Sequence, residues 1–159
     1  MVVRDPRAGT VTGMHSNGER PRAVGINHVA LEVDDIERAI AFYTRLFDIR
    51  DVERAHGGAF IDLGDQFVAL FPPGAGEDRH FGLVVDDKAR ARRVLAANHV
   101  ATLPGNRLDF RDPFGNRVQV VQYDQIQFLK VPEVLRAMGL PALGKTDTAL
   151  AELRSNGLA

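Results

Sequence analysis

The feature that most constrains this chain is a nine-residue phrase that occurs twice. Residues 27–35 read NHVALEVDD and residues 79–87 read RHFGLVVDD. The offset is 52 residues, so His28 corresponds to His80, and the Asp-Asp pair that ends one phrase corresponds to the pair that ends the other. Self-similarity at a fixed offset indicates a repeated structural unit. The chain is therefore predicted to contain two related modules.

The first module, residues 24–71, is predicted to fold as βαβββ. Strict strand alternation assigns Asn27, Val29, Leu31 and Val33 to one face and Ile26, His28, Ala30 and Glu32 to the other. An aspartate then caps a helix that begins at Ile36 and ends before Asp48. Extended runs separated by glycine-containing turns follow at about 50–55, 58–63 and 66–71.

The second module, residues 79–123, repeats this order after a linker rich in proline and glycine. Its first strand, at residues 80–85, places His80, Gly82 and Val84 on one face. A helix is expected at 89–98, and strands at 100–103, 108–111 and 117–123. The last two strands are joined by the turn sequence DPFGN.

Two segments lie outside the modules. Residues 1–22 lack periodicity and are predicted to form a flexible arm. Residues 124–159 are predicted to form a helical tail, with one short helix from Pro132 and another at 146–156 closed by Gly157. The tail helices either pack on the backs of the modules or on a second subunit, or they form a lid over a pocket.

The composition excludes several classes of function. Lysine and arginine number 20 against 21 acidic residues, so no broad electrostatic field would recruit nucleic acid or an anionic membrane. The absence of cysteine excludes disulfides, thiolate metal sites and a thiol nucleophile. Neither a signal peptide nor an 18-residue apolar stretch is present, so a cytoplasmic protein with a small-molecule ligand is expected.

Two such modules in tandem, with a second module that closes on DPFGNRVQV, resemble the vicinal oxygen chelate superfamily. That superfamily includes glyoxalases, bleomycin resistance proteins, extradiol dioxygenases and fosfomycin-resistance transferases. The resemblance covers about residues 24–123, and it places the family's domain at 23–123. It implies an α+β fold in which the tandem modules form a cup-like curved mixed sheet with helices outside, followed here by the helical tail. It also implies a homodimer and a ligand within the cup.

The resemblance further implies a divalent metal, of which zinc, nickel, manganese and iron are candidates. Carried over position by position, its ligands are His28, His80 and Gln119. A fourth family position falls at Ala69, or at Val68 if the register shifts, and neither side chain can bind a metal. Gln119 replaces the usual glutamate and therefore supplies an oxygen without its charge. Non-haem iron oxygenases normally use two histidines and a carboxylate, so an oxygenase is disfavoured.

Two further residues are candidates for catalysis. Asp109 is expected to face the cup, where it could ligate the metal, act as a base or pair with an arginine, being flanked by Arg107 and Arg111. Tyr123 is expected on the face of Gln119, where its hydroxyl could donate to a ligand. Phe67 and Phe71 share the cup face in the first module, where they either favour an apolar or planar ligand or simply pack against the sheet.

Two functions remain open from the sequence. One is a metal-dependent glyoxalase-like enzyme that acts on a small molecule with vicinal oxygens, as a lyase, isomerase or transferase rather than a dioxygenase. The other is a metal-free protein of the bleomycin resistance type that binds or sequesters an antibiotic-like or aromatic molecule. The two retained histidines favour the first, and the missing carboxylates favour the second.

Overall fold

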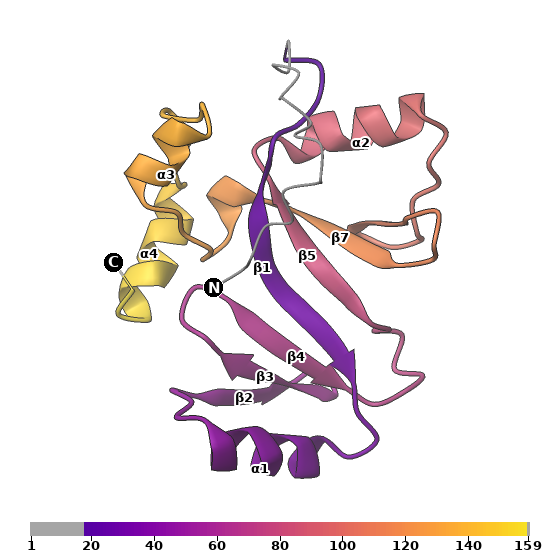
Figure 1. Cartoon of the computed structure of the whole chain (residues 1–159), viewed down its shortest axis with the longest axis vertical. Coiled ribbons are helices and arrows are strands. Elements are labelled where there is room, and N and C mark those ends of the chain that lie inside the picture. The colour runs from indigo at the N-terminus through magenta and orange to yellow at the C-terminus, as the bar shows by residue number, and fades with distance from the viewer. Residues whose placement is uncertain (1–17, 159) are drawn as a thin grey trace, which may run out of the picture.

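The computed structural model describes residues 18–158. The arm predicted for residues 1–22 therefore lies outside the described part of the chain, except for its last residues from Gly18 onward. Figure 1 shows a curved sheet with α1 and α2 near opposite ends and the two tail helices together at one side. Within residues 18–158, no helix is both long and apolar enough to cross a membrane.

The first module contains β1 (Ala23–Glu32), α1 (Ile36–Leu46), β2 (Val52–Ala55), β3 (Gly58–Asp62) and β4 (Phe67–Phe71). The second contains β5 (His80–Val85), α2 (Lys88–Ala97), β6 (Leu108–Arg111) and β7 (Arg117–Gln122). The second aspartate of each repeated phrase caps the helix that follows: the Asp35 side chain accepts from the backbone N–H of Arg38, and Asp87 accepts from that of Arg90. This cap explains why the repeated phrase ends in aspartate.

The seven strands form one mixed sheet in the order β2-β3-β4-β1-β5-β7-β6. Within the modules, β1 is parallel to β4 and β5 is parallel to β7, whereas β1 and β5 pair antiparallel and join the two modules. The predicted βαβββ order is confirmed in the first module. The strand predicted at 100–103 is reduced to a single bridge between Thr102 and Phe110, because Pro104 follows directly and has no N–H for a longer ladder.

The helices cover the convex face of the sheet. Ile40 of α1 packs against Ile61 and Leu70, and Ala91 of α2 packs against Leu108 and a neighbouring valine of β7. Because side chains alternate along a strand, the residues between these core positions point to the concave face. The concave face is therefore the only sheet surface that the two module helices leave free within the described chain.

A β-bulge interrupts the alternation in β1. The pairing of β1 with β5 shifts register between Ile26 and His28, so one extra residue is accommodated at this point. As a result Ile26 is 47% exposed, while Asn27 and His28 are both 7% exposed. The prediction that Asn27 and His28 lie on opposite faces was wrong, since strict alternation does not allow for a bulge.

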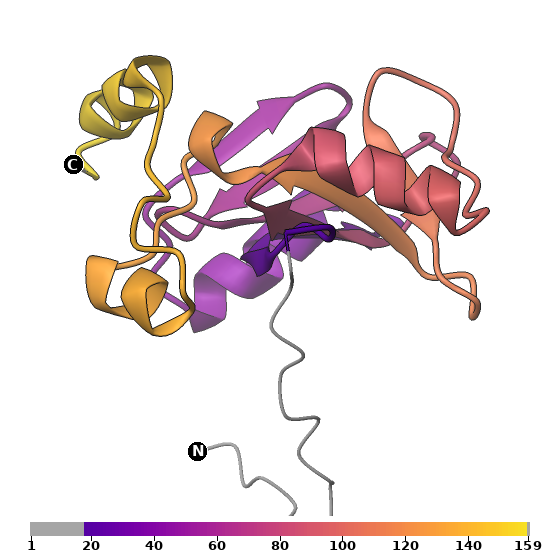
Figure 2. The same ribbon diagram turned by 90° about the horizontal axis from the view of Figure 1, so that it is seen from above.

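The tail forms η1 (Tyr123–Gln125), α3 (Pro132–Ala137) and α4 (Asp147–Ser155), so its two predicted helices are confirmed. Phe128 and Leu135 of the tail pack with Val84 and Val121, which lie two residues beyond Gly82 and Gln119 on the concave face. Packing on the backs of the modules was therefore a wrong expectation. Figure 2 shows the tail helices beside the sheet, away from α2.

Candidate functional site

Strand pairing aligns the predicted site residues in two adjacent rows across the concave face. In the first row, each residue pairs with the next in the order Asp62, Phe67, His28, Gly82, Gln119 and Asp109. In the second row, the order is Phe60, Ala69, Ala30, His80, Arg117 and Arg111. The two modules therefore bring His28 and His80 together from neighbouring strands, as the repeated phrase suggested.

The two imidazole rings lie side by side. Their centroids are 5.2 Å apart and their planes are nearly perpendicular, at 84°. Both residues are 7% exposed. The His28 ring also stacks on the Phe67 ring, with centroids 4.8 Å apart and planes 2° from parallel.

Hydrogen bonds fix the same tautomer on both rings. Nδ1 of His80 lies 2.7 Å from the main-chain carbonyl oxygen of Asp78, which can only accept, so this nitrogen donates. Nδ1 of His28 lies 2.9 Å from the side-chain oxygen of Asn27 and donates in the same way. In a neutral ring, the lone pair is then on Nε2. Metal-binding histidines commonly have this arrangement of the second nitrogen.

His28 is neutral at neutral pH. Burial is the main cause that lowers the pKa of His28 from 6.5 to about 4, and the nearby His80 and Arg107 act in the same direction. A hydrogen bond with the Gln119 side chain and the charge of Asp109 act in the opposite direction. A neutral imidazole keeps its lone pair available to a metal or to a hydrogen-bond donor.

Gly82 makes room for this arrangement. A Cβ atom built on Gly82 would overlap both Oδ1 of Asn27 and Nδ1 of His28. The site therefore requires glycine at the centre of the first row. Sequence reasoning assigned no role to Gly82 or Asn27, although a glycine inside a strand is a known signal of a close approach.

Asp109 is held by an arginine that sequence reasoning did not identify. Arg117 donates to Oδ2 of Asp109 from Nε at 3.0 Å and from Nη2 at 2.5 Å, whereas Arg107 is 4.0 Å away and Arg111 pairs with Asp78. Oδ1 of Asp109 is buried and has no hydrogen-bond partner among residues 18–158. Asp109 therefore pairs with an arginine, as expected, but the main partner is Arg117 of the second row and not an arginine that flanks Asp109 in the sequence.

Tyr123 is not at the site. Strand β7 ends at Gln122, so the alternation that would carry Tyr123 to the cup stops one residue too early. Its side chain is 2% exposed in the core beneath the tail, and its hydroxyl accepts from the backbone N–H of Lys130 at 3.3 Å. The position of Tyr123 gives it a packing role.

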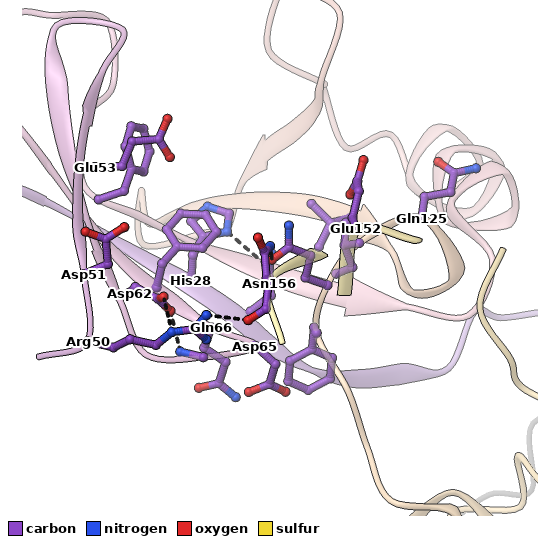
Figure 3. Close-up of a pocket in the computed structure, with 18 of the residues that line it drawn as sticks. His28, Arg50, Asp51, Glu53, Asp62, Asp65, Gln66, Gln125, Glu152 and Asn156 are labelled. Carbon is purple, nitrogen blue, oxygen red and sulfur yellow. Dashed lines mark hydrogen bonds and ion pairs between the residues drawn. The ribbon is translucent and has the colours of Figure 1, made fainter. Parts of the chain in front are cut away.

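A cavity of about 740 Å³ opens over the first row, and its walls come from both modules and the tail (Figure 3). His28, Gln119 and Asn27 lie in its lining together with three phenylalanines, Phe60, Phe67 and Phe128. The tail contributes Gln125, Ile126, Gln127, Phe128, Glu152 and Asn156. The tail therefore forms a wall of the cavity, and the alternative of a lid over a pocket remains a prediction.

The donor set fits a divalent metal held by two histidines. Two imidazoles bound to one tetrahedral ion through bonds of about 2.0 to 2.1 Å place their ring centroids about 5 Å apart, which matches the separation of His28 and His80. Among residues 18–158 there is no group of three or more histidine, cysteine, aspartate or glutamate side chains arranged to hold a metal. A third ligand would therefore be the amide oxygen of Gln119.

Several solved structures are similar to this chain. A methylmalonyl-CoA epimerase solved with methylmalonyl-CoA and NH4+ is similar at 15% identity and a TM-score of 0.52, over 68% of this chain and all of that one. A superfamily member from Vibrio splendidus 12B01 has 20% identity and a TM-score of 0.44, over 64% and 97% of the two chains. A lactoylglutathione lyase from Agrobacterium tumefaciens has 26% identity and a TM-score of 0.29, over 62% and 93%.

The family assignment follows from the match along the sequence. A sequence model of the glyoxalase/bleomycin resistance protein/dioxygenase superfamily matches residues 25–120, which span β1 to β7 and contain both histidines and Gln119. The match covers more than half of the chain, and the paired modules form the curved mixed sheet expected of that family. The chain therefore belongs to the glyoxalase/bleomycin resistance protein/dioxygenase superfamily.

Proposed function

We propose that the protein is a metal-dependent enzyme that binds a small organic molecule in the cavity over the first row. In this proposal His28, His80 and Gln119 hold a divalent metal, for which zinc, nickel, manganese and iron are the candidates. When bound, the metal would polarise an oxygen atom of the ligand. The observation that carries the proposal is the pair of adjacent, buried imidazoles whose Nδ1 atoms are both held by protein acceptors, which leaves Nε2 as the nitrogen of each ring that could bind a metal.

The chain's own residues perform three tasks in this proposal. Phe67 and Asn27 fix the plane and the tautomer of His28. The carboxylate of Asp109, held by Arg117 at the end of the first row, counteracts part of the effect of the Arg107 charge on His28. The three phenylalanines give an apolar surface against which a small ligand can pack, and the tail closes one side of the cavity.

The lack of a carboxylate among the three proposed ligands disfavours one class of reaction. Non-haem iron oxygenases use a carboxylate beside two histidines as a metal ligand. Here the third ligand position in the first row holds the amide of Gln119, and the carboxylate of Asp109 already accepts a hydrogen bond from Arg117. A lyase, isomerase or transferase reaction is therefore proposed in preference to a dioxygenase. The expected homodimer and cytoplasmic location remain predictions.

A second candidate function is metal-free binding of an antibiotic-like or aromatic molecule. The neutral Gln119 at the third ligand position and the aromatic wall of the cavity favour it. In this case, the imidazoles and amide of the first row would act as hydrogen-bond partners for the ligand.

Metal analysis of protein purified without a histidine tag, followed by calorimetric titration with each candidate metal, distinguishes the two. Enzyme function requires near-stoichiometric metal whose affinity falls on the order of 100-fold in His28→Ala and in His80→Ala, and rises in Gln119→Glu. His99→Asn is the matched control, because His99 is exposed and asparagine tolerates its positive φ of 57°. Metal binding that is absent, or unchanged in both alanine variants, would contradict the metal-dependent proposal and favour the binder.

A further inference from the structure

The charged side chains that line the cavity are mostly acidic. The lining contains one cationic side chain, Arg50, and five carboxylates, Asp51, Glu53, Asp62, Asp65 and Glu152. In the view of Figure 3, Glu53, Asp51 and Asp62 lie on one side of His28 and Glu152 lies on the other. The cavity and its aromatic wall mark the ligand site, and these carboxylates determine which charge the site favours.

The one cation in the lining is already used. Nε of Arg50 lies 3.7 Å from Oδ2 of Asp62, and its Nη2 donates to the main-chain carbonyl of Asn156 at the end of α4. Asp65 accepts from the backbone N–H of Leu129 at 2.8 Å, and its charge also acts on Lys145 behind the wall. Asp62 is therefore paired with a cation, and Asp65 lies close enough to Lys145 for their charges to interact.

The other three carboxylates are unbalanced. Asp51, Glu53 and Glu152 make no ion pair with any cation in the described part of the chain. Glu53 lies directly opposite Phe60 in the pairing of β2 with β3, so the two side chains share the concave face. Glu152 reaches the cavity from the tail, on a different element. The unpaired negative charge therefore comes from two separate walls.

Beside His28, the lining has phenylalanine rings and no cationic side chain other than Arg50. The faces of phenylalanine rings carry the negative part of the ring quadrupole and attract cations. Lys130 already lies over the Phe128 ring, 5.4 Å from its centroid, whereas Phe60 and Phe67 have no such cation among residues 18–158.

We propose that the cavity selects a cationic ligand, an aromatic or planar organic amine or guanidine. This inference rests on the proposed function, since it takes the cavity over the first row to be the ligand site. The ammonium or guanidinium group would lie among the carboxylates of Asp51, Glu53 and Glu152, and the planar part would lie against Phe60 and Phe67. An anionic ligand, such as a coenzyme A ester with its phosphates, finds no unpaired cation in the lining.

The expected preference is moderate and depends on salt. Asp51, Glu53 and Glu152 are exposed, so water and ions screen them, with a Debye length of about 8 Å at physiological ionic strength. At low salt, a cation should bind about tenfold more tightly than a neutral molecule of the same shape, and an anion correspondingly more weakly. The difference should shrink as salt is added.

Three probes of matched shape test this inference on metal-free full-length protein by calorimetry: 2-naphthylmethylamine, 2-naphthylmethanol and 2-naphthylacetate. The wild-type protein should bind them in that order of affinity. The double variant Glu53→Gln/Glu152→Gln keeps the side-chain size, removes two unpaired charges, and should lose most of the preference. Glu133→Gln is the control, because Glu133 is exposed on α3, pairs with Arg136 and does not line the cavity.

The outcomes separate this inference from the proposed function. Equal affinity for the three probes, or a preference that survives in the double variant, would overturn the cationic ligand and leave the metal site untouched. Failure of all three probes to bind would overturn the cavity as a ligand site, and this inference with it. A charge preference without any metal binding would support the inference and contradict the metal-dependent enzyme.

Discussion

At the scale of single residues, His80 is oriented by neighbours that do not line the cavity. Arg117 is 7% exposed and donates to Asp109, to Oδ1 of Asp78 at 2.5 Å and to the Gly76 carbonyl at 3.2 Å. The main-chain carbonyl of Asp78 in turn orients His80. Arg117 is thus a positioning residue that joins the carboxylate of the first row to the histidine of the second.

Replacing Arg117 tests this role. Arg117→Met should lower the free energy of unfolding by about 3 to 5 kcal/mol, because it leaves the carboxylate of Asp109 buried without a partner. The double variant Arg117→Met/Asp109→Leu should recover much of that loss. Urea denaturation measures both. Arg136→Met, which breaks the exposed pair with Glu133, should cost less than about 1 kcal/mol, and an equal loss in the two methionine variants would argue against a buried pair.

Gly82 offers a second test at this scale. Gly82→Ala should displace His28 or Asn27, because a Cβ atom there overlaps both, and metal affinity should fall on the order of tenfold or more. Gly144→Ala is the matched control, since its Cβ meets no atom within 4 Å. Calorimetric titration measures the effect, and equal metal affinities in the two variants would show that the ring does not depend on the space over Gly82.

The pKa of His28 predicts how stability changes with pH in the metal-free protein. Because this pKa is lower in the folded chain, at about 4, than the ordinary 6.5, the unfolded chain binds the proton more readily. Stability should therefore be full above pH 6.5 and fall as the pH drops towards 4, by on the order of 3 kcal/mol. Urea denaturation across this range should give a shallower slope of the unfolding free energy against pH for His28→Gln than for the wild-type protein. An identical slope in both proteins would contradict the lowered pKa of His28.

At the scale of elements, the tail lies outside the part of the chain that matches the family. Residues 25–120 match the family, and the tail that follows supplies one wall of the cavity. Lys145 anchors this wall: its Nζ donates to the carbonyl of Tyr123 and, at 2.9 Å, to that of Ile126, and lies 3.6 Å from the centroid of the Tyr123 ring. One side chain thus ties the segment before α4 to the end of β7.

Removing this anchor should separate ligand binding from metal binding. Lys145→Met leaves two partly buried carbonyls without their donor, which should cost about 1 to 3 kcal/mol of stability. The affinity for 2-naphthylmethylamine should fall as the wall loosens, while metal affinity should hold, because no proposed ligand lies in the tail. Lys88→Met at the start of α2 is the control. Loss of metal binding in Lys145→Met would show that the tail supports the histidines as well.

The elements also show what sequence patterns can and cannot predict. The helices α1 and α2, and the strands β5 and β6, follow the predicted ranges because their apolar periodicity and aspartate caps are local signals. The bulge at Ile26, the lost strand at 100–103 and the place of the tail depend on contacts between distant segments. In the same way, the repeat predicted that His28 and His80 correspond, but Arg117, Gly82 and the acidic lining became visible only once the strands were paired.

At the scale of the whole molecule, the antiparallel pairing of β1 with β5 is what creates the site. It places the strand of His28 next to the strand of His80, and the parallel pairing of β5 with β7 adds Gln119 to the same face. Neither module alone contains the two imidazoles. The proposed metal site is therefore a product of the duplication, and its test has to observe both rings in the intact chain.

Long-range ¹⁵N–¹H NMR of the histidine rings makes that observation directly. In metal-free protein at pH 7, His28 should be neutral, Nδ1 of both His28 and His80 should carry a proton, and both Nε2 signals should change together when one equivalent of zinc is added. The signals of the exposed His56 and His99 should stay unchanged and provide the internal control. A ring with its proton on Nε2, or a zinc response confined to one of the two histidines, would contradict a shared metal site.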